Sequence, residues 1–279
     1  AVEHVSAGSV SDPVTKEYTE DTMKDGFIRV AAATPDIHVA DPQYNSEQII
    51  ELMEQGSTRG VKVMAFPELC LTAYTCSDLF LQESLLREAK KELKRILQAS
   101  KSKDMIIFVG MPWMHKGKLY NVAAVLNRGR ILGIVPKKHL PNYSEFYELR
   151  HFNPGMEKVE MTDWEGVQVP MGMNLLFACR TMPELVLAAE LCEDVWVPCP
   201  PSISHALAGA TVIANCSASD ETTGKDQYRY NLICGQSARL VCGYIYANAG
   251  EGESSQDLVF GGQNIIAENG TCLVQSDRF

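Results

Sequence analysis

The sequence lacks any long hydrophobic run and has a deficit of basic residues. Its 279 residues contain no uninterrupted stretch of 18 apolar residues, so the sequence predicts no membrane-spanning helix. Lysine and arginine total 25 against 35 aspartates and glutamates, which gives a formal net charge of −10. Nucleic acids and anionic membranes are bound mainly through basic patches. The charge balance therefore argues against both as principal partners.

Sequence motifs for metal binding, nucleotide binding and serine catalysis are also absent. The nine cysteines include no CxxC pair and the six histidines never stand four residues apart, so we expect no zinc site and no other metal site. No GxxxxGK(S/T) or GxGxxG loop is present to hold phosphates, and no GxSxG turn is present to carry a serine nucleophile. An odd number of scattered cysteines is typical of reduced thiols, so we predict a cytoplasmic protein without disulfides.

Residues 26–279 have the composition and periodicity of one globular domain. Apolar residues make up 46% of the chain, which is enough for a sizeable core. The polar segment 1–25 has no apolar stretch like that of a signal peptide, and we interpret it as a flexible leader or tag-like extension. Beyond it, apolar runs typical of buried strands alternate with segments of helical periodicity, which predicts an α/β domain. The predicted strands are 27–37, 61–68, 104–113, 121–137 (two strands joined at 127–129), 185–192, 210–217, 241–248 and a hairpin at 264–276 that turns at Asn269-Gly270. The predicted helices are 45–60 and 81–99, the second with an apolar stripe on one face.

Three reactive side chains each follow an apolar run. Glu68 comes after VMAFP, Lys137 after ILGIVP and Cys192 after LVLAAEL. Ligands of open α/β sheets bind beyond the carboxyl ends of the strands, so these side chains can share one site. A thiol can attack an amide carbonyl, a carboxylate can move the protons, and an ammonium can stabilise the charge that develops on oxygen. The three residue types together are sufficient for acyl transfer.

Each of the three residues also has an ordinary structural interpretation. A cysteine at a strand end is usually a small buried hydrophobic residue. A lysine there is mostly a solvated surface charge, and a Pro-Glu pair is usually a turn or a helix cap. Cys192 is also followed by Glu193 and Asp194, whose charges disfavour a thiolate unless a cation lies nearby. From the residues alone, a structural role and a catalytic role both stay open.

Five blocks of the sequence resemble one family of enzymes. FPELCLTAYTCSDLF (66–80), VPKKHLPNYSEFYE (135–148) and AAELCEDVW (188–196) resemble the Glu, Lys and Cys motifs of the nitrilase, or carbon–nitrogen hydrolase, superfamily. IANCSASDETTGKDQYR (213–229) and DLVFGGQNIIAENG (257–270) narrow the resemblance to the amino-terminal glutaminase domains of glutamine-dependent NAD synthetases. The resemblance implies a nitrilase-like αββα sandwich of two stacked mixed sheets, an arrangement that the periodicity alone does not indicate.

The resemblance assigns roles to four catalytic residues. It implies that Glu68 is the general base and that Cys192 is the nucleophile that carries a glutamyl thioester. Lys137 matches the catalytic lysine of a Lys-x-His/Tyr-Leu pattern, and would share the oxyanion with the backbone N–H that follows Cys192. Glu145, eight residues after this lysine, matches a second carboxylate that orients the lysine and the substrate.

The same comparison with the family implies three substrate contacts. Tyr143, Ser219 and Lys225 fall where the family binds the carboxylate and amino ends of glutamine. Some members have arginine at the position of Lys225. A lysine keeps the charge but loses the bidentate fork of a guanidinium, so this departure from the family weakens the expected contact.

The resemblance also implies the substrate and the partners. The expected reaction is hydrolysis of L-glutamine to glutamate and ammonia, and the domains are expected to pair into a homo-oligomer. Whole synthetases continue into an ATP-using domain with an SGGxDS loop, and no such segment occurs in this sequence. ATP, magnesium and deamido-NAD are therefore expected only in that synthetase domain, which would receive the ammonia, and no cofactor is expected here. A free-standing amidase acting on another ω-amide and a catalytically silent assembly domain are the alternatives.

Overall fold

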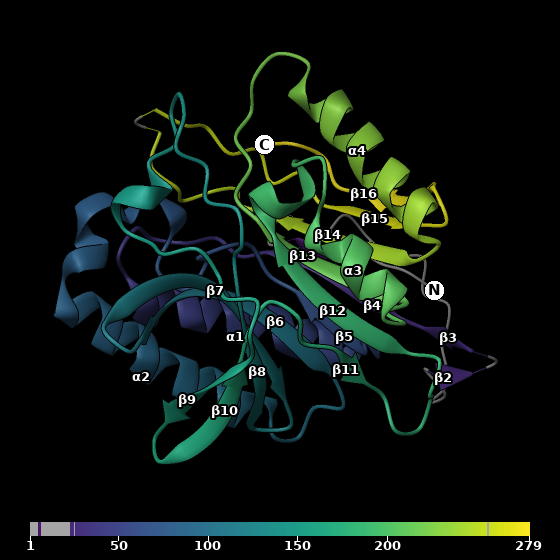
Figure 1. Ribbon diagram of the computed structural model, residues 1–279, viewed down its shortest axis with the longest axis horizontal. Helices are drawn as coiled ribbons and strands as arrows, with labels where there is room; N and C mark the ends of the chain where they lie inside the picture. Colours follow the sequence, from purple (N-terminus) through teal and green to yellow (C-terminus); the bar gives the residue numbers. More distant parts are fainter. Residues whose placement is uncertain (1–4, 7–22, 25, 256) are drawn as a thin grey trace.

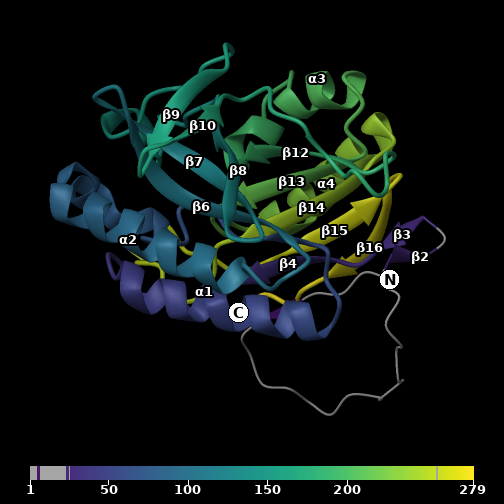
Figure 2. The same cartoon turned by 90° about the horizontal axis from the view of Figure 1, so that it is seen from below.

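Two stacked β-sheets form the centre of the structure, a computed structural model that describes residues 5–6, 23–24, 26–255 and 257–279. The larger sheet has the strand order β1-β4-β5-β6-β7-β8-β10-β9, and the smaller has the order β11-β12-β13-β14-β15-β16. Helices cover the outer face of each sheet (Figures 1 and 2). The layers confirm the α/β fold expected above, an αββα sandwich of two mixed sheets.

Each of the two large sheets is built from its own stretch of the chain. The larger sheet comprises β1 (Val5–Ser6), β4 (Val30–Thr34), β5 (Val63–Ala65), β6 (Ile106–His115), β7 (Lys118–Asn127), β8 (Arg130–Pro136), β9 (Glu160–Trp164) and β10 (Val167–Met171). The smaller comprises β11 (Phe177–Ala178), β12 (Val186–Leu191), β13 (Val212–Ser217), β14 (Gly243–Asn248), β15 (Ile265–Glu268) and β16 (Thr271–Gln275). The helices are α1 (Pro42–Thr58), α2 (Glu83–Ser100), α3 (Pro201–Leu207) and α4 (Lys225–Leu240), with 3₁₀ turns η1 (Tyr74–Leu81), η2 (Glu148–Arg150) and η3 (Cys192–Val195).

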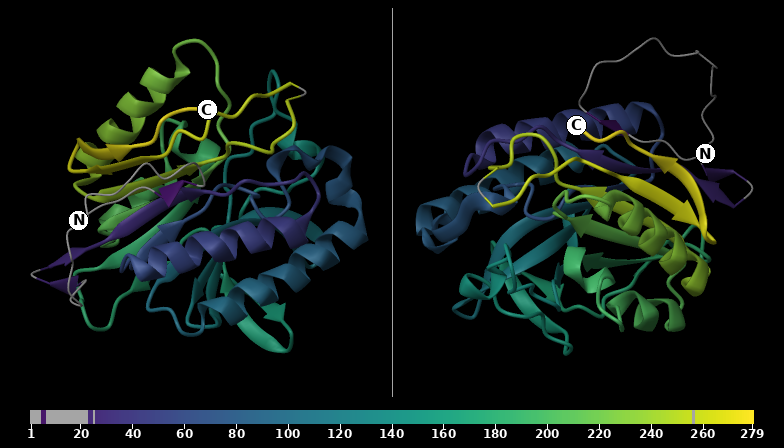
Figure 3. Two further views of the ribbon diagram at one scale, coloured as in Figure 1. Left: turned by 180° about the vertical axis from the view of Figure 1, so that it is seen from behind. Right: turned by 90° about the horizontal axis from the view of Figure 1, so that it is seen from above.

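Helices α1 and α2 lie side by side on the larger sheet (Figures 2 and 3). The predicted apolar stripe of α2 is buried there, including Leu93 and Ile96. Helix α1 begins three residues before the predicted start, because the side chain of Asp41 accepts a hydrogen bond from the N–H of Tyr44 and Pro42 takes the first helical position. Within the described residues, no helix is both long and apolar enough to cross a membrane.

The two sheets pack on each other through small and branched side chains. Ala32, Ala65 and Phe108 of the larger sheet share one buried cluster with Leu187 and Ala214 of the smaller. Strands β4, β5, β6 and β8 run parallel to one another, as do β12, β13 and β14. The turns predicted at 127–129 and at Asn269-Gly270 are confirmed, whereas the β9–β10 hairpin was not predicted from the sequence.

Part of the segment interpreted as a leader pairs with the domain. Strand β1 adds to the edge of the larger sheet in parallel with β4, and β2 (Met23–Lys24) pairs with β3 (Phe27–Ile28). Four residues of the segment that we interpret as a flexible leader or tag-like extension therefore form strand pairs with the domain. The rest of that segment lies outside the described residues.

The carboxyl ends of the parallel strands of both sheets meet at one edge of the sandwich. The N–H of Glu68, after β5, donates to the carbonyl of Ser217, at the end of β13, over 3.3 Å. Gly110 of β6 lies directly under this contact. A Cβ atom at Gly110 would stand 2.7 Å from the Cα of Glu68 and 2.2 Å from the carbonyl oxygen of Pro67. Only a residue without a side chain fits there.

Gly110→Ala should therefore destabilise the fold and displace Glu68. We expect a loss of about 1–3 kcal/mol or more, as for overpacked cores, since backbone atoms cannot move aside as side chains do. Gly235→Ala is the matched control, because a Cβ atom at this position of α4 meets nothing within 4 Å and should be neutral or stabilising. Urea unfolding of both variants measures the difference. Equal midpoints would contradict the close approach.

Candidate active site

Glu68 and Lys137 form a buried ion pair at the edge where the strands end. The Nζ atom of Lys137 lies 2.6 Å from Oε1 of Glu68, and both side chains are fully buried. Asn121 of β7 donates to the same oxygen over 2.7 Å, and the N–H of Ala218 donates to Oε2 over 3.1 Å. Two of the three predicted residues are thus in direct contact, and the carboxylate is held through both oxygens.

The second carboxylate on Lys137 is Glu148, so the prediction of Glu145 is wrong. Oε1 of Glu148 accepts from Lys137 Nζ over 2.6 Å and from the hydroxyl of Tyr74 over 2.8 Å. The chain turns into η2 at this point, which buries Glu148. Glu145 is half-buried and lines a cavity of about 80 Å³ beside it. Both glutamates stand in the motif 135–148. A loop has no regular spacing of buried residues, so the sequence does not indicate which of the two is buried.

Cys192 begins the turn η3 directly after β12. Its backbone has φ of 38°, a left-handed conformation that is costly for a residue with a side chain. The N–H of Cys192 donates to Oδ1 of Asn215 over 3.0 Å, and the amide of Asn215 donates in turn to the hydroxyl of Tyr244 over 3.0 Å. These buried bonds hold the strained turn in place, with the thiol facing Ser217 and the charges of Glu68 and Lys137.

Asp194 joins the loop of the nucleophile to the loop of the lysine. Its Oδ2 accepts from the N–H of Leu191 over 3.1 Å, and its Oδ1 accepts from the N–H of His139 over 2.8 Å. Burial raises the pKa of Asp194 to about 7, although these hydrogen bonds oppose the rise. The two loops therefore keep a fixed separation, which sets the distance between Cys192 and Lys137.

The charges of the site favour a protonated thiol. Burial tends to lower the pKa of Lys137, but Glu148 and Glu68 outweigh this and raise the pKa well above its ordinary value. Burial raises the pKa of the Cys192 thiol, Glu68 raises it further, and Lys137 offsets only part of the rise. Burial raises the pKa of Glu148 to about 7, and when this group is ionised the two carboxylates and one ammonium leave one negative charge in excess. Moving the thiol proton to Glu68 leaves this net charge unchanged, so general-base activation is the least costly way to form a thiolate here.

Two of the predicted substrate contacts, Tyr143 and Lys225, lie near Glu193, the residue after Cys192, and we call these three residues the mouth of the site. The hydroxyl of Tyr143 lies 3.1 Å from both carboxylate oxygens of Glu193. Lys225, in the first turn of α4, forms an ion pair with Asp220, and its ammonium lies 5.5 Å from the ring centre of Trp196. Sequence reasoning treated Glu193 only as a charge beside the thiol and gave Trp196 no role.

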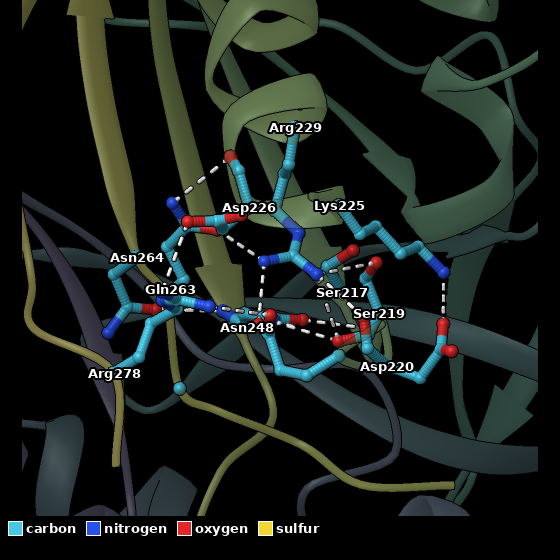
Figure 4. Close-up of polar contacts among 12 residues, drawn as sticks. Ser217, Ser219, Asp220, Lys225, Asp226, Arg229, Asn248, Gln263, Asn264 and Arg278 are labelled. Atoms are coloured by element: carbon cyan, nitrogen blue, oxygen red, sulfur yellow. Dashed lines mark hydrogen bonds and ion pairs between the residues drawn. The ribbon is translucent and has the colours of Figure 1, made fainter. Parts of the chain in front are cut away.

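Ser219 is buried, and its hydroxyl faces Arg229 rather than the mouth of the site. The guanidinium of Arg229 lies 3.2 Å from the Oγ of Ser219 (Figure 4). Sequence reasoning missed Arg229, as it missed Asn121 and Asn215. Lys225 and Arg229 stand four residues apart in one helix, which is the only sequence signal for a shared face.

No group of three or more His, Cys, Asp or Glu side chains within the described ranges could hold a metal ion.

Fold and site together place a buried Glu-Lys pair beside a cysteine at the ends of strands from two stacked sheets, and these are the groups that hydrolysis of a carbon–nitrogen bond through a thioester requires. The sequence profile of the family described as carbon–nitrogen hydrolase matches residues 29–279. The chain belongs to this family.

Within the family, the chain is similar to glutamine-dependent NAD(+) synthetases. It is 42% identical to the protein of that name from Mycobacterium tuberculosis over 91% of this chain, and 31% identical to that of Aquifex aeolicus over 86% of this chain. It spans only 37% and 38% of the length of these two relatives. A crystal structure of such a synthetase from Cytophaga hutchinsonii superposes with a TM-score of 0.79 at 28% identity, covering 88% of this chain and 40% of that one. A Nesterenkonia amidase of the nitrilase superfamily shares the fold, with a TM-score of 0.68 at 19% identity over 88% of this chain and 85% of that one.

The raised pKa of Cys192 predicts how its reactivity depends on pH. A free thiol titrates near pH 8.5, and its thiolate fraction stops rising soon above that pH. The thiolate fraction of a thiol with a raised pKa rises about tenfold per pH unit both below and above pH 8.5. Alkylation of Cys192 by iodoacetamide, without substrate, should therefore rise steadily from pH 7 to pH 9. Peptide mass spectrometry measures the rate, with the exposed Cys199 as internal reference. A plateau below pH 8 would show a thiolate already present at neutral pH.

Proposed function

We propose that this chain hydrolyses the side-chain amide of L-glutamine through a cysteine thioester and supplies ammonia for amidation of deamido-NAD. The observation that carries the proposal is the buried contact of Lys137 with Glu68, beside Cys192, at the ends of strands from both sheets. The names of the relatives support glutamine as the substrate and NAD as the final product. The coverage of 37% of such a relative fits a glutaminase portion of a longer enzyme.

The contacts of the site define the sequence of proton transfers. Glu68 takes the thiol proton while the sulfur of Cys192 attacks the amide carbon, and the ammonium of Lys137 stabilises the resulting oxyanion. The oxyanion then collapses, the carbon–nitrogen bond breaks, and Glu68 returns its proton to the leaving nitrogen, which departs as ammonia. Glu68 then deprotonates a water molecule, which attacks the thioester. The carbon–sulfur bond breaks, glutamate leaves, and Glu68 returns the proton to the sulfur of Cys192. Glu148 keeps Lys137 charged and in position throughout.

The residues at the mouth match the two charged ends of glutamine. The ammonium of Lys225 suits the α-carboxylate, and the carboxylate of Glu193 suits the α-ammonium, with Tyr143 hydrogen-bonded to Glu193. Binding of glutamine between these charges would place its side-chain amide toward Cys192.

The proposal extends to the location of the protein, its partner domain and its assembly. Nine unpaired cysteines support a reducing, cytoplasmic location. ATP, magnesium and deamido-NAD are expected to bind in a synthetase domain, which would receive the ammonia, and the chain is expected to assemble as a homo-oligomer.

Cys192→Ala should abolish ammonia release from glutamine, by more than about 1,000-fold, because the variant lacks the thiol that attacks the amide carbon. The matched control is Cys199→Ala, which removes an exposed thiol and should keep activity within about twofold of the parent chain. An enzyme-coupled ammonia assay measures both, and circular dichroism checks the fold. Ammonia release that persists in folded Cys192→Ala would refute the thioester route.

Glu148→Gln should reduce ammonia release by about 100-fold, since the loss of one charged partner misplaces the oxyanion donor Lys137. Glu145→Gln, three residues earlier in the same loop, should change it by less than about threefold because Glu145 makes no contact with that lysine. Steady-state kinetics of the two variants compares them. A larger effect from Glu145→Gln would restore the assignment made from the sequence.

A further inference from the structure

Arg229 is a fully buried arginine behind the mouth of the site. Its exposed fraction is 0%, and it is among the largest fully buried side chains in the described part of the chain. Burying a guanidinium is costly unless its donors are paired. The carboxylate of Glu221 accepts one bond over 2.7 Å, and the side chain of Gln263 accepts another. The Nε atom finds no partner among the described residues, so part of the cost is not recovered.

The other nitrogen of the guanidinium holds the loop that leads to Lys225. It donates to the carbonyl of Asp220 over 2.8 Å and lies 3.2 Å from the Oγ of Ser219 (Figure 4). One side chain therefore contacts three successive residues, 219 to 221, through its fork. A fork of fixed geometry holds these residues relative to each other as well as to α4.

Asn248, at the end of β14, holds the same loop from the opposite side. The N–H of Ser219 donates to its Oδ1 over 2.8 Å, and its Nδ2 donates to the carbonyl of Ser219 over 3.1 Å. The N–H of Asn248 donates in turn to Oδ1 of Asn264 over 2.8 Å. The start of the loop is thus anchored to the smaller sheet, and the contacts of Arg229 and the ion pair of Lys225 with Asp220 connect it to the helix that follows.

Arg229 and Lys225 stand one helical turn apart in α4 (Figure 4). Lys225 pairs with Asp220 on the loop, and Arg229 binds the carbonyl of that same residue. The position of the Lys225 ammonium is therefore set by how the arginine docks the first turn of α4 onto residues 219–221. None of these contacts involves Cys192, Glu68 or Lys137.

We propose that Arg229 is a positioning residue that determines selectivity for the amino-acid end of glutamine, by docking the loop 219–221 onto the helix that carries Lys225. This inference rests on the function proposed above. The reacting groups lie elsewhere, so loss of the docking should weaken recognition of the charged ends of glutamine and leave the reactivity of the thiol intact. A lysine at position 229 keeps the charge but cannot contact residues 219, 220 and 221 together.

The test measures protection of Cys192 from iodoacetamide by glutamine and, separately, by butyramide, which has the amide but neither charged end. The parent chain is measured first, since a lack of protection by glutamine would contradict the proposed function itself. Arg229→Lys should raise the half-protecting glutamine concentration at least about tenfold and leave that of butyramide within about twofold. The alkylation rate without ligand should also stay within about twofold. Arg239→Lys makes the same chemical change in the last turn of α4 and should alter neither value.

Three results would overturn the proposal. The first is an unchanged half-protecting concentration of glutamine in Arg229→Lys. The second is an equal loss of protection by glutamine and butyramide, which would indicate general distortion of the site. The third concerns the case in which Arg229→Lys does not fold. Protection by glutamine is then measured in the double variant Arg229→Met/Glu221→Gln, which removes both buried charges. Normal glutamine protection in this variant, or its failure to fold, would show that the arginine serves only stability.

Discussion

The structure depends on one buried ion cluster, in which the ammonium of Lys137 bridges the carboxylates of Glu68 and Glu148. Both distances are 2.6 Å, and all three side chains are buried. Charged groups persist in such surroundings only when every partner is held in place, since losing one partner leaves an uncompensated charge. Asn121, Tyr74 and the N–H of Ala218 supply the remaining hydrogen bonds. The elements around the site must therefore bring both carboxylates and their hydrogen-bond partners to the one ammonium of Lys137.

The two stacked sheets meet this constraint from opposite sides. The larger sheet supplies Glu68 and Lys137, and the smaller supplies Cys192 and the N–H of Ala218. Contact between the sheets is close because alanines line the shared core, and Gly110 has no side chain to push Glu68 out of place. Asp194 then links the loop of the nucleophile to that of the lysine. The same packing that buries the charges also excludes water, which strengthens their interaction with a developing oxyanion.

The sequence predicted those parts of the fold and site that depend on local patterns. Apolar periodicity located α2, and the Asn-Gly turn located the last hairpin, because both signals lie within a few residues. Family motifs led to Glu68, Lys137 and Cys192, whose proximity the structure shows. The assignment of the second carboxylate to Glu145 was wrong, because the burial of Glu148 depends on contacts such as that with Tyr74, 74 positions away along the chain. Arg229 was missed for a similar reason, since its partners Glu221 and Gln263 become neighbours only when α4 packs on the smaller sheet.

The central claim is that Cys192 is the nucleophile for glutamine. The most direct measurement is to incubate the chain with an electrophilic glutamine analogue and to locate the adduct by peptide mass spectrometry, with and without excess glutamine. The account predicts a single adduct on Cys192 that glutamine suppresses, since the analogue and glutamine compete for the same charged groups beside this thiol. Labelling spread over several of the nine cysteines, or labelling that glutamine does not change, would contradict it.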